Sequence, residues 1–189
     1  MPGASTPLNR ISEFAACSDS SLINAPVTSV AMPDVPGASY GGFALFFPGS
    51  GAFAVECMSP RRLSDSSAGS ELIMSTWAAK SIIAFRILLR ELGFRRSPPT
   101  PLEMDAAAIT QGVQMERVSR QQRFQAARLA MMRQWIDDGI ISLVKTDTRY
   151  MRADILTKPL SPGLDYRAKQ SLLLTGSDGR TGDGVAHIK

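Results

Sequence analysis

Apolar and polar stretches alternate along the chain in a way that separates short strand-like runs from longer helical ones. Three apolar runs bounded by Gly and Pro predict the first strands, at residues 27–32, 40–47 and 52–58. The sequence Pro-Gly-Ser-Gly at 48–51, between the second and third runs, is typical of a hairpin. Because the three runs follow one another closely, we expect an antiparallel meander.

The apolar period then becomes helical. Between residues 71 and 92 it recurs at Leu72, Thr76, Ala79, Ile83 and Ile87, and the glycine at 93 is a natural C-cap. A second helix is expected at 120–137, with a buried stripe formed by Phe124, Ala127, Met131 and Trp135. Short strands are expected at 102–104 and 140–145, and a brief helix at 153–158. This order predicts an α/β or α+β arrangement with a mixed five-stranded sheet, a meander followed by alternating helices and strands, and α/β is the fold class that we expect.

The two ends of the chain lack such periodicity. Residues 1–25 are rich in Ser, Ala and Pro and predict a loose leader, and residues 161–189 accumulate Gly, Ser and Asp and predict a flexible tail. The expected domain is therefore residues 26–160. The uncharged stretch at 40–55 is interrupted by Pro and Gly and is too short to span a bilayer, so we expect no membrane partner.

Composition limits the kinds of partner and reaction that we expect. The 21 Lys and Arg residues against 17 Asp and Glu give a formal charge of +4, which is compatible with a polyanionic partner. The single histidine, His187, is near the C-terminus, which argues against a histidine-based mechanism. Cys17 and Cys57 have neither metal-ligand spacing nor a disulfide pattern. We therefore expect reduced thiols in an intracellular protein, cytoplasmic or nuclear.

Four acidic residues fall at the ends of predicted strands or the starts of predicted helices: Asp34, Glu71, Asp105 and Asp154. Carboxylates that converge at one rim of a sheet repel one another unless a cation neutralises them. Oxygen ligands favour Mg²⁺ or Mn²⁺, and a pair of such ions can cleave a phosphodiester. Helix dipoles and turn preferences alone would also explain acids at these positions.

Four segments, in a shared order, carry a family resemblance: GGFALFFPGSGAFAVECMSPR at 41–61, SSAGSELIMSTWAAKSIIAFRILLRELG at 66–93, MDAAAI at 104–109, and SRQQRFQAARLAMMRQWIDDGIISLVKTDTRYMRADILTKPL at 119–160. They resemble the ribonuclease H domain of copia-type LTR retrotransposon Pol polyproteins. The most specific piece is ADILTKPL at 153–160, which is nearly verbatim. The resemblance covers about two-thirds of the chain.

The resemblance implies a ribonuclease H-like fold and a hydrolase that cuts the RNA strand of RNA–DNA hybrids with two Mg²⁺ or Mn²⁺ ions. Position by position, the family's catalytic and metal-binding carboxylates fall on Glu71, Asp105 and Asp154. Asp34 is the candidate for the carboxylate at the end of the first strand. The implied partners are an RNA–DNA hybrid and the reverse transcriptase domain of the same polyprotein.

Three departures from the family pattern leave an alternative open. Gly69 replaces the first glutamate of the family's Thr-Glu-Ala-Glu motif, alanines follow Asp105, and Gln122-Arg123 replaces a Lys-His pair. A catalytically decayed relic that only binds nucleic acid or a polymerase domain is therefore the second hypothesis.

Several arginines are candidates for phosphate contacts with the hybrid: Arg86, Arg90, Arg117, Arg120 and Arg123. For any single one of these arginines, a solvated helix face is the better explanation. Trp77 and Trp135 are expected to pack in the core rather than to stack on bases.

Overall fold

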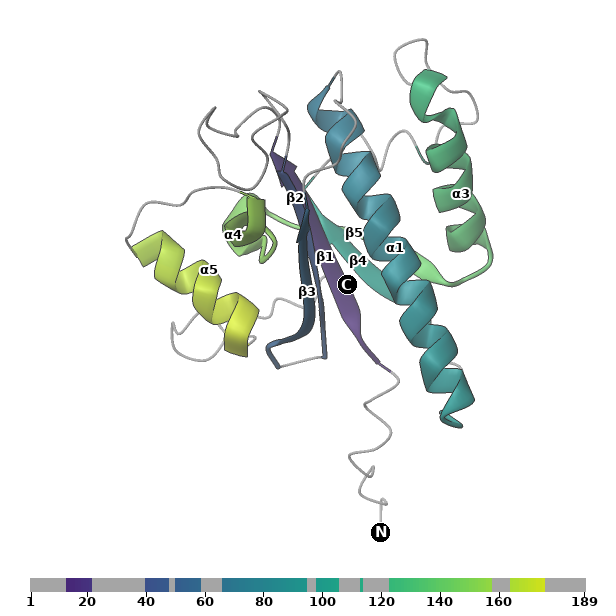
Figure 1. The fold of residues 1–189 in the computed structure, drawn as a ribbon, viewed down its shortest axis with the longest axis horizontal. Coiled ribbons are helices and arrows are strands. Elements are labelled where there is room, and N and C mark those ends of the chain that lie inside the picture. Colours follow the sequence, from purple (N-terminus) through teal and green to yellow (C-terminus); the bar gives the residue numbers. More distant parts are fainter. Residues whose placement is uncertain are drawn as a thin grey trace.

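The computed structural model describes residues 13–21, 40–47, 50–58, 66–94, 98–105, 113, 123–157 and 164–175. The strands are β1 (Ala15–Ser21), β2 (Tyr40–Phe46), β3 (Ala52–Met58), β4 (Thr100–Met104) and β5 (Ile141–Lys145). The helices are α1 (Ser67–Glu91), α3 (Ala126–Asp137), α4 (Asp154–Thr157) and α5 (Leu164–Thr175), with short 3-10 helices η2 (Arg123–Gln125) and η3 (Thr148–Tyr150). Figure 1 shows how these elements are arranged.

The strands form one mixed sheet in the order β3-β2-β1-β4-β5. The first three pair antiparallel as a meander, whereas β4 is parallel to both β1 and β5. The expected mixed five-stranded sheet is therefore confirmed, as are the predicted strands that became β2, β3, β4 and β5.

The first strand differs from the prediction. The central strand β1 lies inside residues 1–25, which were expected to be a loose leader, and the strand predicted at 27–32 lies outside the described residues. The sequence AACSDSS lacks the β-branched and aromatic residues on which strand prediction relies. Small side chains are favoured here because helices cover both faces, and residues 16–20 are all buried.

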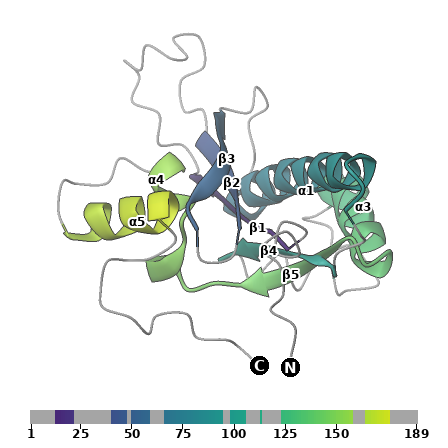
Figure 2. The same ribbon diagram turned by 90° about the horizontal axis from the view of Figure 1, so that it is seen from below.

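Helices α1 and α3 lie on one side of the sheet, and α4 and α5 lie on the other (Figures 1 and 2). The larger core, which includes Ile82, Leu102 and Leu129, fills the side of α1 and α3. A smaller core on the other side contains Cys17, Ala44, Phe46, Met151, Ala153 and Leu173. Helix α5 therefore corrects the expectation of a flexible tail for residues 164–175, because Leu173 packs into this second core.

Helix α1 begins and ends near its predicted limits. The Ser66 side chain caps its N-terminus by accepting a hydrogen bond from the Gly69 N–H at 3.1 Å, and Gly93 follows its end with a φ of 84°. The predicted stripe is buried at Leu72, Thr76 and Ala79, but Ile87 is 46% exposed. Leu89, two residues later, is 6% exposed, so Ile87 lies on the side of this turn that faces away from the core.

The buried face of α3 is not the predicted one. Leu129 and Met132 are buried, whereas Ala127 and Met131 are exposed and Trp135 packs at the edge of the core. Apolar residues occur all around this helix, so periodicity alone does not fix which face turns inward.

The expectation that Trp77 packs in the core is also wrong. Its side chain is 45% exposed, and the Lys80 ammonium lies 5.7 Å from its ring centroid.

By length and composition, α1 is apolar enough to cross a membrane, a property that the sequence reading overlooked. Core helices pass the same test, and half of its most apolar 18-residue window is buried in the fold. In this structure α1 is the helix that covers β1 and β2.

We predict that Ile82→Ala lowers the free energy of unfolding by about 2–5 kcal/mol, because Ile82 is fully buried between α1 and the sheet. Urea denaturation measures the change. The matched control is Ile87→Ala on the exposed part of the same helix, expected to cost less than about 0.5 kcal/mol. Equal losses in both variants would contradict the packing described for α1.

Candidate functional site

Asp19 lies on the central strand and is only 2% exposed. Side chains alternate between the two faces of β1. Ser18 points toward α1, where its hydroxyl lies 3.1 Å from the Ser75 hydroxyl, whereas Cys17 packs in the core beneath α4 and α5. Asp19 is therefore on the α4 face, in line with its contact to Thr157 of α4. A carboxylate buried in the middle of a sheet requires polar partners.

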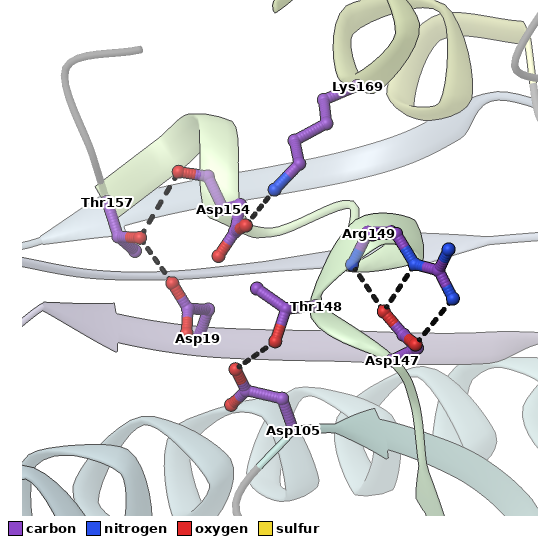
Figure 3. A network of polar contacts seen from close by, with 8 residues as sticks. All are labelled: Asp19, Asp105, Asp147, Thr148, Arg149, Asp154, Thr157 and Lys169. Atoms are coloured by element: carbon purple, nitrogen blue, oxygen red, sulfur yellow. Dashed lines mark hydrogen bonds and ion pairs between the residues drawn. The ribbon is translucent and has the colours of Figure 1, made fainter. Parts of the chain in front are cut away.

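Asp154 begins α4 and is 1% exposed. Its Oδ2 forms an ion pair with the Nζ of Lys169, which reaches across from α5 (Figure 3). The Lys169 side chain is 12% exposed, so both charges of the pair are largely removed from water.

Thr157 links the two buried aspartates. Its hydroxyl donates to Oδ2 of Asp19, and the same oxygen lies 3.2 Å from the carbonyl oxygen of Asp154 (Figure 3). The close approach of α4 to the sheet depends on Gly42, where an added Cβ would collide with the Leu156 side chain. The short helix is thus held directly over β1 and β2.

Asp105 follows β4, and its Oδ2 accepts a hydrogen bond from the Thr148 hydroxyl at 3.3 Å. Strands β1 and β4 are parallel, with Cys17 opposite Glu103. Asp19 and Asp105 each lie two residues further along, so they occupy the same end of neighbouring parallel strands. The predicted Asp105 and Asp154 thus lie on elements that flank Asp19 (Figure 3).

Glu71 lies in the second turn of α1 and is half-buried. Its carbonyl oxygen accepts a 2.8 Å hydrogen bond from the Ser75 hydroxyl, which also contacts Ser18 beside Asp19. This turn of α1 therefore lies next to β1, on the face opposite α4. Asp34, the fourth predicted carboxylate, lies outside the described residues.

The carboxylate oxygens of Asp19 and Asp154 and the Thr157 hydroxyl are donors of the kind that Mg²⁺ or Mn²⁺ accepts, whereas the Lys169 ammonium beside Asp154 is not a ligand. Within the part of the chain that the structure describes, no three His, Cys, Asp or Glu residues are grouped to hold one metal ion. The positive charge beside Asp154 comes instead from Lys169. The arrangement is two buried carboxylates, each satisfied by a side chain of the protein itself.

The thiol nearest the aspartates is not a nucleophile. Burial, and to a lesser extent the negative charge of Glu103, raises the pKa of Cys17 to about 12. Burial also raises the pKa of Glu103, although the Arg152 guanidinium opposes this shift. At neutral pH Cys17 is therefore protonated, and the chemistry of this region is that of its carboxylates.

The predicted phosphate-binding arginines differ in their contacts and exposure. Arg86 donates to the Pro98 carbonyl at 2.8 Å and to the Thr100 hydroxyl at 2.9 Å, so it fastens α1 to the start of β4. Arg90 forms an exposed ion pair with Glu91 at 3.4 Å, and Arg123 is exposed in η2. Arg117 and Arg120 lie outside the described residues.

The sequence reading missed three residues of this site, namely Asp19, Thr157 and Lys169. A signal for the first was present, because the uninterrupted apolar run of residues 14–17 before Asp19 is consistent with a buried strand. The pairing of Lys169 with Asp154 has no local signal, since it depends on how α5 docks.

No family model matches the sequence, and no curated protein matches it. Among solved structures, the chain is similar to LC11-RNase H1, isolated from compost by a metagenomic approach, with a TM-score of 0.57 and 12% identity over 77% of this chain and 93% of that one. The complex of LC11-RNase H1 with an RNA/DNA hybrid gives a TM-score of 0.55 and 11% identity over 77% and 94% of the two chains.

The foamy viral protease-reverse transcriptase in complex with dsDNA is also similar, with a TM-score of 0.52 and 12% identity over 76% of this chain and 90% of that one. At such identities these likenesses show the fold alone. The expected ribonuclease H-like fold is thereby confirmed.

We predict that Thr157→Val lowers the free energy of unfolding by about 1–3 kcal/mol, because the buried Asp19 carboxylate loses its hydroxyl donor. Thr157→Ser keeps the hydroxyl and is expected to lose clearly less. Chemical denaturation of the two variants makes the comparison. A larger loss in the Ser variant would show that the methyl group, and not the hydrogen bond, stabilises this position.

Proposed function

We propose that this protein is a divalent-cation-dependent ribonuclease H that hydrolyses the RNA strand of RNA–DNA hybrids. The observation that carries the proposal is a pair of buried carboxylates on the α4 side of a ribonuclease H-like sheet. Asp19 on β1 accepts a hydrogen bond from the Thr157 hydroxyl, and Asp154 at the start of α4 contacts the same hydroxyl through its backbone carbonyl. Burying two acids in a small domain is costly for stability, which favours a functional role for them.

In this proposal the first-strand carboxylate is Asp19 rather than Asp34. Asp19 is on the strand that pairs with both the hairpin strand β2 and the parallel strand β4. Asp154, Asp105 and Glu71 complete the set of ligands, as the sequence resemblance implies. Asp105 supports this role by its position at the same end of the sheet as Asp19.

The chain's own groups have distinct parts in the mechanism. Asp19 and Asp154 supply negative charge on short, rigid elements, and the Thr157 hydroxyl orients the Asp19 carboxylate. Divalent cations bound by these carboxylates would activate the attacking water and stabilise the 3′ leaving oxygen. Exposed basic side chains such as Arg123 would contact the phosphates of the hybrid, a form of recognition that depends on charge and backbone shape.

The finer identity is also part of the proposal. The near-verbatim ADILTKPL stretch and the three other matching segments support a ribonuclease H domain from a copia-type Pol polyprotein, with the reverse transcriptase domain as its neighbour. An intracellular location, cytoplasmic or nuclear, belongs to the same proposal.

We predict that the wild-type protein cleaves the RNA strand of a labelled RNA–DNA hybrid with Mg²⁺ or Mn²⁺ and not with EDTA. Asp19→Asn and Asp154→Asn are each expected to lower the rate by at least ~100-fold, because each removes a charged ligand. Asp137→Asn, at the exposed end of α3, is the control and is expected to keep the wild-type rate.

The same assay compares Asp19 with Asp34. If Asp34→Asn abolishes cleavage and Asp19→Asn does not, the reassignment to Asp19 is wrong. If the folded wild-type protein binds the hybrid but cleaves nothing with either cation, the proposed activity fails and the decayed binding domain takes its place.

A further inference from the structure

The Lys169–Asp154 ion pair lies at a carboxylate that the proposed function assigns to cation binding. It joins the acid that begins α4 to a lysine on α5, fifteen residues later, and both side chains are largely buried. A buried carboxylate needs a compensating charge or hydrogen-bond donors, and Lys169 supplies the charge for Asp154. A cation that binds Asp154 must therefore share or displace the lysine.

We propose that Lys169 is an internal counter-ion that competes with the divalent cation for Asp154. The inference rests on the proposed function, since it concerns the same carboxylate. With Lys169 in place, the cation-free protein keeps its buried acid neutralised. When a divalent cation binds, the Lys169 ammonium moves away from Oδ2 of Asp154. Because this ion pair must be broken, the apparent affinity for the cation is reduced.

Helix α5 is placed to support this role. Leu173 anchors it in the smaller core, and the backbone carbonyl of Leu174 lies so close to Gly51 that an added Cβ there would collide with it. Lys169 lies one turn before this anchor, on a side chain long enough to swing toward solvent without moving the helix. The exchange therefore requires a rotamer change of Lys169 and leaves the docked α5 intact.

Competition also follows because the Lys169 ammonium and a divalent cation bind the same carboxylate. Two ligands that bind the same group exclude each other, and the coupling acts equally in both directions. Removing the ammonium therefore has two linked effects. The cation-free protein loses stability because a buried charge is left alone, and the cation binds more tightly because nothing opposes it.

The test measures Mn²⁺ binding by isothermal titration calorimetry and the Mn²⁺-dependent rise in Tm, both without substrate. Lys169→Met removes the charge and keeps most of the side-chain length. It is expected to bind Mn²⁺ about 10–100-fold more tightly than wild type and to gain more Tm from Mn²⁺. Arg167→Met removes one positive charge from the exposed face of the same helix and is expected to match wild type.

A double variant assigns the effect to the pair. In the Asp154→Asn background, Lys169→Met is expected to give no gain in Mn²⁺ affinity over Asp154→Asn alone, because the carboxylate for which the two cations compete is gone. A gain that persists in the double variant would overturn the inference.

A second measurement uses the wild-type protein, in case Lys169→Met does not fold. Acetylation by an amine-reactive ester, read by peptide mass spectrometry, is expected to increase several-fold at Lys169 when Mn²⁺ is added, because the ammonium is released. The exposed Lys80 is the internal reference and is expected to react equally with and without Mn²⁺. Unchanged acetylation at Lys169, with Mn²⁺ bound, overturns the inference.

The outcomes separate the two proposals. If wild type and Lys169→Met bind Mn²⁺ equally well, the counter-ion inference is wrong and the proposed cation-dependent function stands. If neither binds Mn²⁺, the cation dependence of the proposed function fails as well.

Discussion

The constraint on which this structure depends is the burial of two carboxylates, Asp19 in the sheet and Asp154 on α4. Asp19 and Asp154 are both almost completely buried, and a buried carboxylate without partners costs several kcal/mol of stability. The Thr157 hydroxyl satisfies one and the Lys169 ammonium satisfies the other. Helices α4 and α5 are therefore more than a cover for this face, because α4 carries the hydroxyl that contacts Asp19 and α5 carries the ammonium that pairs with Asp154.

The same requirement explains the composition around the site. β1 is made of small residues, and Gly42 admits α4 close to the sheet, so this four-residue helix, which also carries Asp154, brings the Thr157 hydroxyl to Asp19. Such a helix has little stability of its own and depends on tertiary contacts. Met151 and Ala153, which precede it, are fully buried against Cys17 and Phe46 and fix where it begins.

Much of the fold could be predicted from the sequence, for reasons tied to particular elements. Strands β2 and β3 have aromatic and β-branched residues around a Pro-Gly hairpin, and α1 has a long apolar period between a serine cap and Gly93. Strand β1 could not be recognised by propensity, because AACSDSS lacks the β-branched and aromatic residues typical of strands. Because this strand was not recognised, the sequence prediction assigned the first carboxylate to Asp34.

Two of the four predicted carboxylates, Asp105 and Asp154, lie on the elements that flank Asp19, and Glu71 lies on the turn of α1 beside β1. Lys169 could not be predicted, because its partner is chosen by the docking of α5 and not by local sequence. The most direct test of the central claim is anomalous X-ray diffraction from crystals of the wild-type protein grown with Mn²⁺. Our account predicts a Mn²⁺ peak at the carboxylates of Asp19 and Asp154, with the Lys169 ammonium turned away. Crystals that contain Mn²⁺ but show no peak at these carboxylates, with Lys169 still paired to Asp154, would contradict it.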